Sequence, residues 1–254
     1  MALPKVFLGA LCALLLSAQL APAGSDAPGA TCVFGMPESG YAVRKDNTGF
    51  ITEVLRAAFS QAGYDLVHRD IPYPRARGEL ADGRIQCTLS AKGATDSGVA
   101  ARCVIAACDL SVAYLASDAY TGLEDLADQK VAHLFGFDFQ MLLPVRIRPE
   151  PTYDRTLAIQ MLERGRVRFV IGEDTMIREA IHQAGLSVAE FGITRFMSLD
   201  VVPIFTPNTE GFRLRDIFDR RMSEMAASGE LTAIFRKYGL PEDRIRHIIE
   251  ADRR

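Results

Sequence analysis

Residues 31–71 read TCVFGMPESGYAVRKDNTGFITEVLRAAFSQAGYDLVHRDI, and this segment establishes the fold class. It opens with Thr31–Met36, a short apolar run of the kind found in buried strands. Apolar residues then recur at helical spacing through Phe50–Ala62, and Gly63 ends the predicted helix. Asp65–Ile71 is predicted to be a second strand. The order strand, helix, strand is typical of an α/β chain with a parallel sheet.

The alternation of strands and helices continues toward the carboxyl end. Arg75–Ala81 is predicted to be a short helix and Ile85–Ser90 a third strand. A second α/β unit occupies residues 118–198. Two extended segments, Leu110–Leu115 and Asp200–Phe205, flank this unit, and we predict that they are crossover strands. The pattern therefore predicts two α/β lobes.

The length of the chain agrees with this division. A chain of 254 residues suits two lobes of about 100 to 150 residues each. We expect the first lobe to combine residues 24–112 with residues 201–254, which supply a return strand and the C-terminal helices. The second lobe is expected to span residues 113–200.

Composition and charge exclude two classes of protein. Hydrophobic residues make up 48% of the chain and charged residues 24%, the balance of an ordinary globular protein, which excludes wholesale disorder. The chain carries 29 basic and 32 acidic residues, and its net charge is −3. No block of like charge occurs in the sequence, so there is no electrostatic basis for expecting nucleic acid as a partner.

The first 23 residues have the order of a secretory signal peptide. Lys5 precedes an apolar run, Val6–Leu20, and Ala21–Ala23 supplies small residues at both positions that a signal peptidase requires. The run is short for a transmembrane helix, which makes a membrane anchor the less favoured alternative. We therefore predict cleavage after Ala23 and a periplasmic location.

Cysteine usage fits an exported protein. Without Cys12, which lies in the predicted signal peptide, four cysteines remain, and an even number in an exported chain predicts two disulfides with three possible connectivities. The four are Cys32, Cys87, Cys103 and Cys108. Free buried thiols are the alternative.

Spacing favours one of these pairings. Cys103 and Cys108 are separated by four residues, and a tight turn would bring them together. Cys32 and Cys87 lie in the first and third predicted strands, which are neighbours if the first strand is central. A mixed pairing, such as Cys87 with Cys103, remains open. No metal site is expected, because the histidines are scattered and no C-x-x-C or H-x-x-x-H spacing occurs.

Four segments, in this order and spacing, resemble the periplasmic solute-binding proteins of the amino-acid-binding type, the family 3 class. The resemblance covers residues 31–240. The segments are Thr48–Glu53 at the start of the first helix, Pro72–Arg75 with the helix that follows, Leu123–Val131, and Gly229–Gly239.

This resemblance implies a type II, two-lobed periplasmic-binding-protein-like fold, with two crossover strands as a hinge and a ligand in the cleft between the lobes. It implies capture of a small polar solute, such as an amino acid or a related small carboxylate or amine. The expected partners are this small-molecule ligand and a membrane permease of the ABC type. We expect a monomer without a cofactor.

Several candidate ligand residues follow the first two strands. Tyr41, near Glu38 in the first loop, would pack against an apolar part of the ligand. Tyr73 and Arg75 flank Pro74, which stiffens the turn, so that Arg75 could grip a carboxylate with two hydrogen bonds. Solvent-facing loop roles are the alternative for Glu38 and Tyr41, and a surface arginine stacked on Tyr73 is the alternative for Arg75.

The segment after the third strand departs from the family pattern. The resemblance implies hydroxyl and backbone contacts from Ser90 and Thr95, followed by an arginine for the α-carboxylate of the ligand. Here the candidate arginine, Arg102, arrives several residues late and stands beside Cys103. This spacing weakens the case for α-amino-acid binding.

The second lobe contributes a turn and two acids. The resemblance implies that Phe137 and Asp138 lie where backbone N–H groups face an anion. It also implies that Glu173 or Asp174 pairs with the ammonium group of the ligand. Two adjacent acids do not both point into one cleft, and one of them is expected to cap the next helix. We expect Arg75 to face this acidic pair across the cleft.

The sequence offers little support for an enzyme. It contains no G-x-S-x-G, phosphate-binding loop, G-x-G-x-x-G or H-E-x-x-H motif, and we predict no catalytic residue. One enzyme alternative stays open, because exported cyclohexadienyl dehydratases resemble this class, and a buried Glu173 could serve as their acid. A sensory or accessory binding protein without a transporter is another alternative. Binding of a solute for a transporter is the main interpretation.

Overall fold

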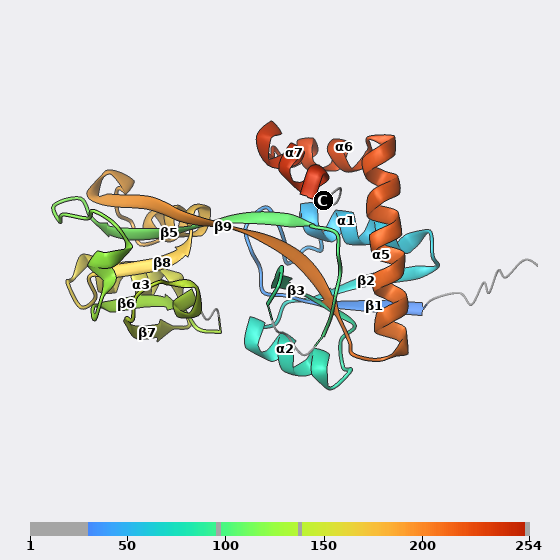
Figure 1. The fold of residues 1–254 in the computed structure, drawn as a ribbon, viewed down its shortest axis with the longest axis horizontal. Coiled ribbons are helices and arrows are strands. Elements are labelled where there is room, and N and C mark those ends of the chain that lie inside the picture. Colours follow the sequence, from blue (N-terminus) through green and yellow to red (C-terminus); the bar gives the residue numbers. More distant parts are fainter. Residues whose placement is uncertain (1–29, 95–97, 137–138, 252–254) are drawn as a thin grey trace, which may run out of the picture.

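The computed structural model describes residues 30–94, 98–136 and 139–251. The predicted signal peptide of residues 1–23 and three candidate ligand residues, Thr95, Phe137 and Asp138, lie outside these ranges. The described chain forms two lobes joined by two long strands (Figure 1). The predicted two-lobed α/β fold is confirmed.

The first lobe has a small sheet covered by helices on both faces. Its helices and strands are β1 (Ala30–Gly35), α1 (Phe50–Ser60), β2 (Tyr64–Arg69), α2 (Tyr73–Ala81), β3 (Cys87–Ala91), β4 (Val99–Ala100), α5 (Thr209–Ser228), α6 (Glu230–Lys237) and α7 (Glu242–Ala251). The second lobe is built from β6 (Lys130–Leu134), β7 (Arg148–Thr152), α3 (Arg155–Glu163), β8 (Phe169–Glu173) and α4 (Asp174–Gln183), with 3-10 turns at Leu123–Leu126, Phe139–Leu142 and Val188–Glu190.

Both lobes share one sheet, because the two joining strands belong to it. The strand order is β2-β1-β3-β9-β5-β8-β6-β7, with β4 paired to β9 outside this path. Strands β1, β2 and β3 are parallel in the first lobe, and β6, β7 and β8 are parallel in the second. Parallel strands end at the same edge of a sheet, so in each lobe the carboxyl ends lie together.

The two joining strands are longer than the sequence predicts. The structure has β5 at Ala106–Leu115 and β9 at Phe191–Phe205, and they pair antiparallel from Ala106 opposite Val201 to Leu115 opposite Phe191. The hinge is therefore a continuous two-stranded ribbon (Figure 1). Its register shifts between Leu110 and Ser111, as at a β-bulge.

Each lobe has its own apolar core. In the first lobe, the rings of Phe59, Phe205 and Phe218 pack together, with centroids 6.1 to 6.5 Å apart, between α1, β9 and α5. In the second lobe, α3 and α4 cover one face of the sheet, and a separate cluster around Phe169 and Val131 fills the other face. The apolar cores of the two lobes are therefore separate, and the β5–β9 ribbon joins them.

Two elements of the second lobe differ from the prediction. The predicted helix over Phe139–Val145 is only a 3-10 turn at Phe139–Leu142. Strand β7 was missed because its sequence, RPEPT, contains Pro149 and Pro151, which lack the N–H group that a central strand needs. It lies at the edge of the sheet, where proline is tolerated.

The two predicted disulfides are wrong. Cys32, Cys87, Cys103 and Cys108 are free thiols in the structure. Strands β1 and β3 are neighbours as expected, but Phe34 lies opposite Cys87. Cys32 is therefore two residues out of register, and diagonal neighbours are about 7 to 8 Å apart, beyond the usual Cα separation in a disulfide.

The predicted Cys103–Cys108 disulfide is absent for a different reason. The backbone N–H of Cys103 donates a 3.0 Å hydrogen bond to Asp219, which ties this residue to α5. Strand β5 then runs extended from Ala106 and carries Cys108 toward the hinge. An extended strand advances about 3.3 Å per residue, so the tight turn required for a Cys103–Cys108 bond does not form.

Within the described ranges, no helix combines the length and apolar character needed to cross a membrane. The same residues contain no group of three or more His, Cys, Asp or Glu side chains placed to hold a metal ion.

Candidate functional site

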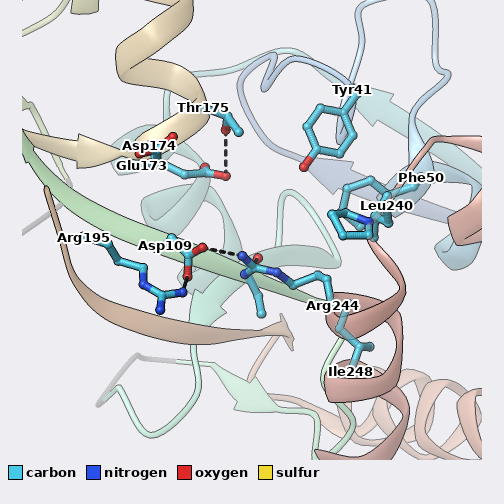
Figure 2. A pocket seen from close by; sticks show the side chains of 12 residues that line it. Tyr41, Phe50, Asp109, Glu173, Asp174, Thr175, Arg195, Leu240, Arg244 and Ile248 are labelled. Carbon is cyan, nitrogen blue, oxygen red and sulfur yellow. Dashed lines mark hydrogen bonds and ion pairs between the residues drawn. The ribbon is translucent and has the colours of Figure 1, made fainter. Parts of the chain in front are cut away.

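A cavity of about 180 Å³ lies between the two lobes, beside the hinge (Figure 2). Its wall combines residues of the first lobe, the hinge strands and the second lobe. They are Tyr41, Phe50, Ala107, Asp109, Glu173, Asp174, Thr175, Arg195, Leu240, Pro241, Arg244 and Ile248. A cavity of about 150 Å³ accommodates a molecule the size of benzene, so this one has room for a small solute.

Sheet topology brings Glu173 to this cavity. Glu173 is the last residue of β8, and it lies opposite Leu110 of the hinge strand β5. The carboxyl end of β8 faces the first lobe, so the side chain projects into the space between the lobes (Figure 2). Asp174 begins α4, where it accepts a 2.7 Å hydrogen bond from Arg178.

The environment of Glu173 disfavours its charge. Burial raises the pKa of this carboxyl, and the charge of Asp109 adds to the increase. The hydroxyl of Thr175, at 3.3 Å, and the charges of Arg155 and Arg244 oppose the shift without cancelling it. Among the described residues, no cation lies within 4.0 Å of this carboxylate. Glu173 is therefore an enclosed acid that faces the cavity without an ion pair.

Tyr41 faces Glu173 from the first lobe. Its ring packs against Phe50, with centroids 5.7 Å apart, and its hydroxyl points into the cavity (Figure 2). Burial raises the pKa of Tyr41, and the charge of Glu173 raises it further. The hydroxyl thus stays protonated and can donate a hydrogen bond to a ligand or to the carboxylate.

Asp109 is an acid with the opposite environment. It lies on β5 and accepts hydrogen bonds from Arg244 of α7 and from Ser198, with Arg195 at 3.5 Å (Figure 2). Burial opposes its ionisation, but these donors outweigh burial and hold the pKa of Asp109 below its ordinary value. Asp109 is therefore ionised, and it occupies the two arginines that line the cavity.

The lobes touch each other at two places around the cleft. A Cβ atom placed on Gly136 would lie 2.2 Å from Cγ of Pro74, so this glycine packs directly against the first lobe. A Cβ atom on Gly40 would lie 3.0 Å from Cε of Met176 on α4. The structure therefore represents a closed arrangement of the two lobes.

Solved structures share this architecture. The chain superposes on the arginine-, lysine-, histidine-binding protein ArtJ from Geobacillus stearothermophilus with a TM-score of 0.67 and 18% identity, over 85% of this chain and 99% of the other. The P235GK mutant of ArgBP from T. maritima gives a TM-score of 0.64 at 14% identity, over 82% and 94%. The fold is that of the two-lobed periplasmic binding proteins.

A sensor domain is also among these similar structures. A histidine kinase sensor domain with similarity to periplasmic binding proteins gives a TM-score of 0.66 at 16% identity, over 83% of this chain and 96% of the other. No protein-family model and no curated protein matches the sequence. Identities of this size show a common fold.

Within this fold, Tyr41, Glu173 and Asp174 are the predicted ligand residues that line the cavity. Glu38 does not line it, and its exposed side chain lies 3.6 Å from Lys45. Tyr73 is buried against the core of the first lobe, and Ser90 is buried in β3.

The two arginines predicted to grip a carboxylate are engaged elsewhere. Arg75 pairs at 2.7 Å with Glu79, one turn along α2, and it is not among the charges that act on Glu173. The expected arrangement of Arg75 opposite the acidic pair is therefore not seen. Arg102 is 87% exposed and bonds to the buried Asp219 of α5, which holds it away from the cavity.

Sequence reasoning missed Asp109, Arg195 and Arg244. Asp109 was overlooked because the predicted crossover strand began one residue later. Arg244 lies on α7, which was not predicted, although Ile245, Ile248 and Ile249 have the spacing of an amphipathic helix.

Proposed function

We propose that this chain is an exported binding protein that captures a small polar solute between its lobes and delivers it to a membrane transporter. The binding-protein fold, the closed arrangement and the interlobe cavity support this function. The export step rests on the predicted signal peptide.

The enclosed carboxylate of Glu173 carries the proposal. Burying an acid without an ion pair is unfavourable, and such a site is stabilised when a ligand supplies the missing partner. The ligand group that fits is an ammonium, a guanidinium or another cationic donor. Tyr41 adds an aromatic face and a hydroxyl beside it. Several of the similar solved structures bind arginine, lysine or histidine, which are solutes of this kind.

The arginines favour an amine over an acid as the ligand. Arg75 and Arg102 are paired outside the cavity, while Arg195 and Arg244 both pair with the single carboxylate of Asp109. The described residues thus leave no arginine in the cavity wall without an acidic partner. We therefore propose that the ligand is held mainly through its cationic end.

A thermal-shift screen of amines, amino acids and small carboxylates tests this function. A ligand that binds only the folded state adds about 2.7 kcal/mol at a hundredfold excess over Kd. Cationic ligands should stabilise the protein, and Glu173→Gln should lose the effect, whereas Glu163→Gln on the exposed face of α3 should keep it. If no compound in the library raises the Tm, solute capture is contradicted.

One observation favours a second candidate, a dehydratase resembling the cyclohexadienyl dehydratases. The raised pKa of Glu173 suits a general acid that protonates a leaving hydroxyl group. Incubation with prephenate and arogenate tests this candidate. Formation of an aromatic product, lost in Glu173→Gln, would establish the enzyme. If no aromatic product forms, solute capture is the function that the site supports.

A further inference from the structure

A second hollow lies at the far end of the second lobe. Its volume is about 340 Å³, and its wall comprises Leu115, Asp118, Gln129, Lys130, Arg148, Leu162, Gly165, Arg166, Val167 and Arg168. Lys130 and Arg148 begin β6 and β7, and Arg168 precedes β8. The hollow therefore opens at the amino edge of these parallel strands, opposite the carboxyl edge that bears Glu173.

Strand register aligns three cations in one row. Lys130 is the direct partner of Arg148 across the β6–β7 pair. On the other side of β6, Val131 pairs with Phe169, and the N–H of Arg168 donates a 3.2 Å hydrogen bond to the carbonyl of Lys130. Neighbouring strands lie about 4.8 Å apart, and like charges directly opposite each other are destabilising. Arg166 adds a fourth cation from the turn before β8.

Nearby acids compensate only part of this charge. Lys130 lies 3.3 Å from Glu150, Asp118 lines the hollow, and Asp125 is close enough to Arg168 for their charges to interact. Arg148 donates from Nε to the neutral carbonyl of Asp128, at 2.7 Å.

The remaining guanidinium groups have no close acid. Arg168 lies over the ring of Phe169, 5.2 Å from its centroid. Within the ranges that the structure covers, no carboxylate lies within 4.0 Å of the guanidinium groups of Arg148, Arg166 or Arg168. Three arginines of like charge therefore converge on one hollow without a direct counter-charge.

We propose that this hollow binds an anion with two or more negative charges and phosphate-type oxygens. The planar guanidinium group suits such oxygens, since it donates two parallel hydrogen bonds. A bound dianion would replace the repulsion within the row by attraction. The phosphate groups of a soluble compound and of a lipid headgroup share this chemistry. The site is separate from the interlobe cavity, so the proposal does not depend on the proposed function.

The test uses pyrophosphate as the probe, at constant ionic strength set with sodium chloride. Pyrophosphate should raise the Tm of the wild-type protein by a few degrees, and Arg148→Gln/Arg168→Gln should remove the response. The control, Arg84→Gln/Arg220→Gln, makes the same charge change at exposed sites of the first lobe and should respond like the wild type.

Titration calorimetry gives a second test, and the stability of the ligand-free variant is its control. Without pyrophosphate, Arg148→Gln/Arg168→Gln loses the repulsion within the row together with the Arg148–Asp128 hydrogen bond and the Arg168–Phe169 contact, so we expect a Tm close to that of the wild type. In titration calorimetry the same variant should bind pyrophosphate at least tenfold more weakly. Equal responses to pyrophosphate in both double variants would overturn the proposal.

Sedimentation with lipid vesicles distinguishes the two sources of phosphate. Binding to vesicles containing phosphatidic acid, whose phosphomonoester can carry two charges, but not to pure phosphatidylcholine vesicles, would identify a headgroup, provided that the double variant loses it. Pyrophosphate binding without vesicle binding would identify a soluble anion. Failure to bind either probe would refute the site.

Discussion

Glu173 and Asp109 line the same cavity, and their surroundings give them different roles. Asp109 is held ionised by Ser198 and Arg244, so its charge is satisfied within the protein. Glu173 has no such ion pair, and burial raises its pKa. The pair illustrates a general principle: a carboxylate that the fold leaves unpaired is available to a ligand, whereas one that the fold neutralises is structural.

Stability should therefore fall with rising pH because of Glu173. A carboxyl whose pKa is raised by folding binds more protons in the folded than in the unfolded state. Its ionisation destabilises the fold as the pH rises above 4.5, the ordinary glutamate pKa. We expect Glu173→Gln to raise the ligand-free Tm at neutral pH and to lose this advantage in acid. Thermal unfolding across this pH range measures the difference in Tm between Glu173→Gln and the wild type. A difference that does not change with pH would contradict the raised pKa.

Asp109 should behave in the opposite way. Its lowered pKa contributes stability above 3.8, the ordinary aspartate value, and this contribution is lost as the pH falls through the pKa of the folded state. We expect Asp109→Asn to cost about 1.5 to 3 kcal/mol in urea unfolding at neutral pH, the range for hydrogen bonds to charged groups. Asp216→Asn, at an exposed ion pair, should cost less than about 0.5 kcal/mol. Equal costs would contradict a structural role for Asp109.

At the scale of elements, α7 connects the C-terminus to both hinge strands. Arg244 donates a 2.8 Å hydrogen bond to the carbonyl of Ala107 on β5, and His247 Nε2 lies 2.6 Å from Asp200 of β9. The apolar residues Ile245 and Ile248 bury the opposite side of the helix in the core. Helix α7 thus ties the first lobe to the end of the ribbon nearest that lobe.

Removing this connection should loosen the hinge. Arg244→Met keeps the aliphatic stem but removes the bonds to Ala107 and Asp109, and we expect a loss of about 1 to 3 kcal/mol. Arg246→Met, on the exposed side of the same helix, is the matched control and should stay within about 0.5 kcal/mol. Hydrogen exchange should also quicken in β5 and β9 of Arg244→Met. Unchanged exchange would contradict the role of α7.

Elements with a strong local pattern could be predicted from the sequence, and those defined by partners could not. Helix α1 and strands β1 and β6 follow from apolar periodicity. Strand β7 forms because it pairs with β6 at the edge of the sheet. Its two prolines make this strand unrecognisable from the sequence pattern. In the site, Glu173 was predictable because it ends a clear strand. Arg244 was not, since its position depends on where the tertiary fold places α7.

At the scale of the whole molecule, the closed arrangement depends on close contacts between the lobes. Gly136 meets Pro74 on one side of the cleft, and Gly40 meets Met176 at the other contact. A Cβ atom at Gly136 would clash with the ring of Pro74, whereas one at Gly40 would only press on the flexible end of Met176. The contact between the lobes thus depends on the absence of a Cβ atom at position 136.

A side chain at Gly136 should hold the lobes apart. Gly136→Ala places a Cβ against the ring of Pro74, so we expect solute binding to weaken at least tenfold and the radius of gyration in X-ray scattering to increase. Gly136 has a φ of 88°, and alanine is strained there in any case. Gly185→Ala, at a φ of 73° with no atom within 4 Å, reproduces the strain without the clash. Equal losses of affinity in both variants would refute the contact.

The ribbon of β5 and β9 also determines when each part of the chain can become folded. The second lobe is one uninterrupted segment, whereas β3 of the first lobe finds its partner β9 only after that whole segment has been made. Contacts that are distant along the chain form slowly, because the intervening loop must close first. The amino-terminal half of the first lobe therefore stays incomplete until late in synthesis. Delayed assembly of this kind fits the proposed export, because the chain would still be incompletely folded when it reached a membrane.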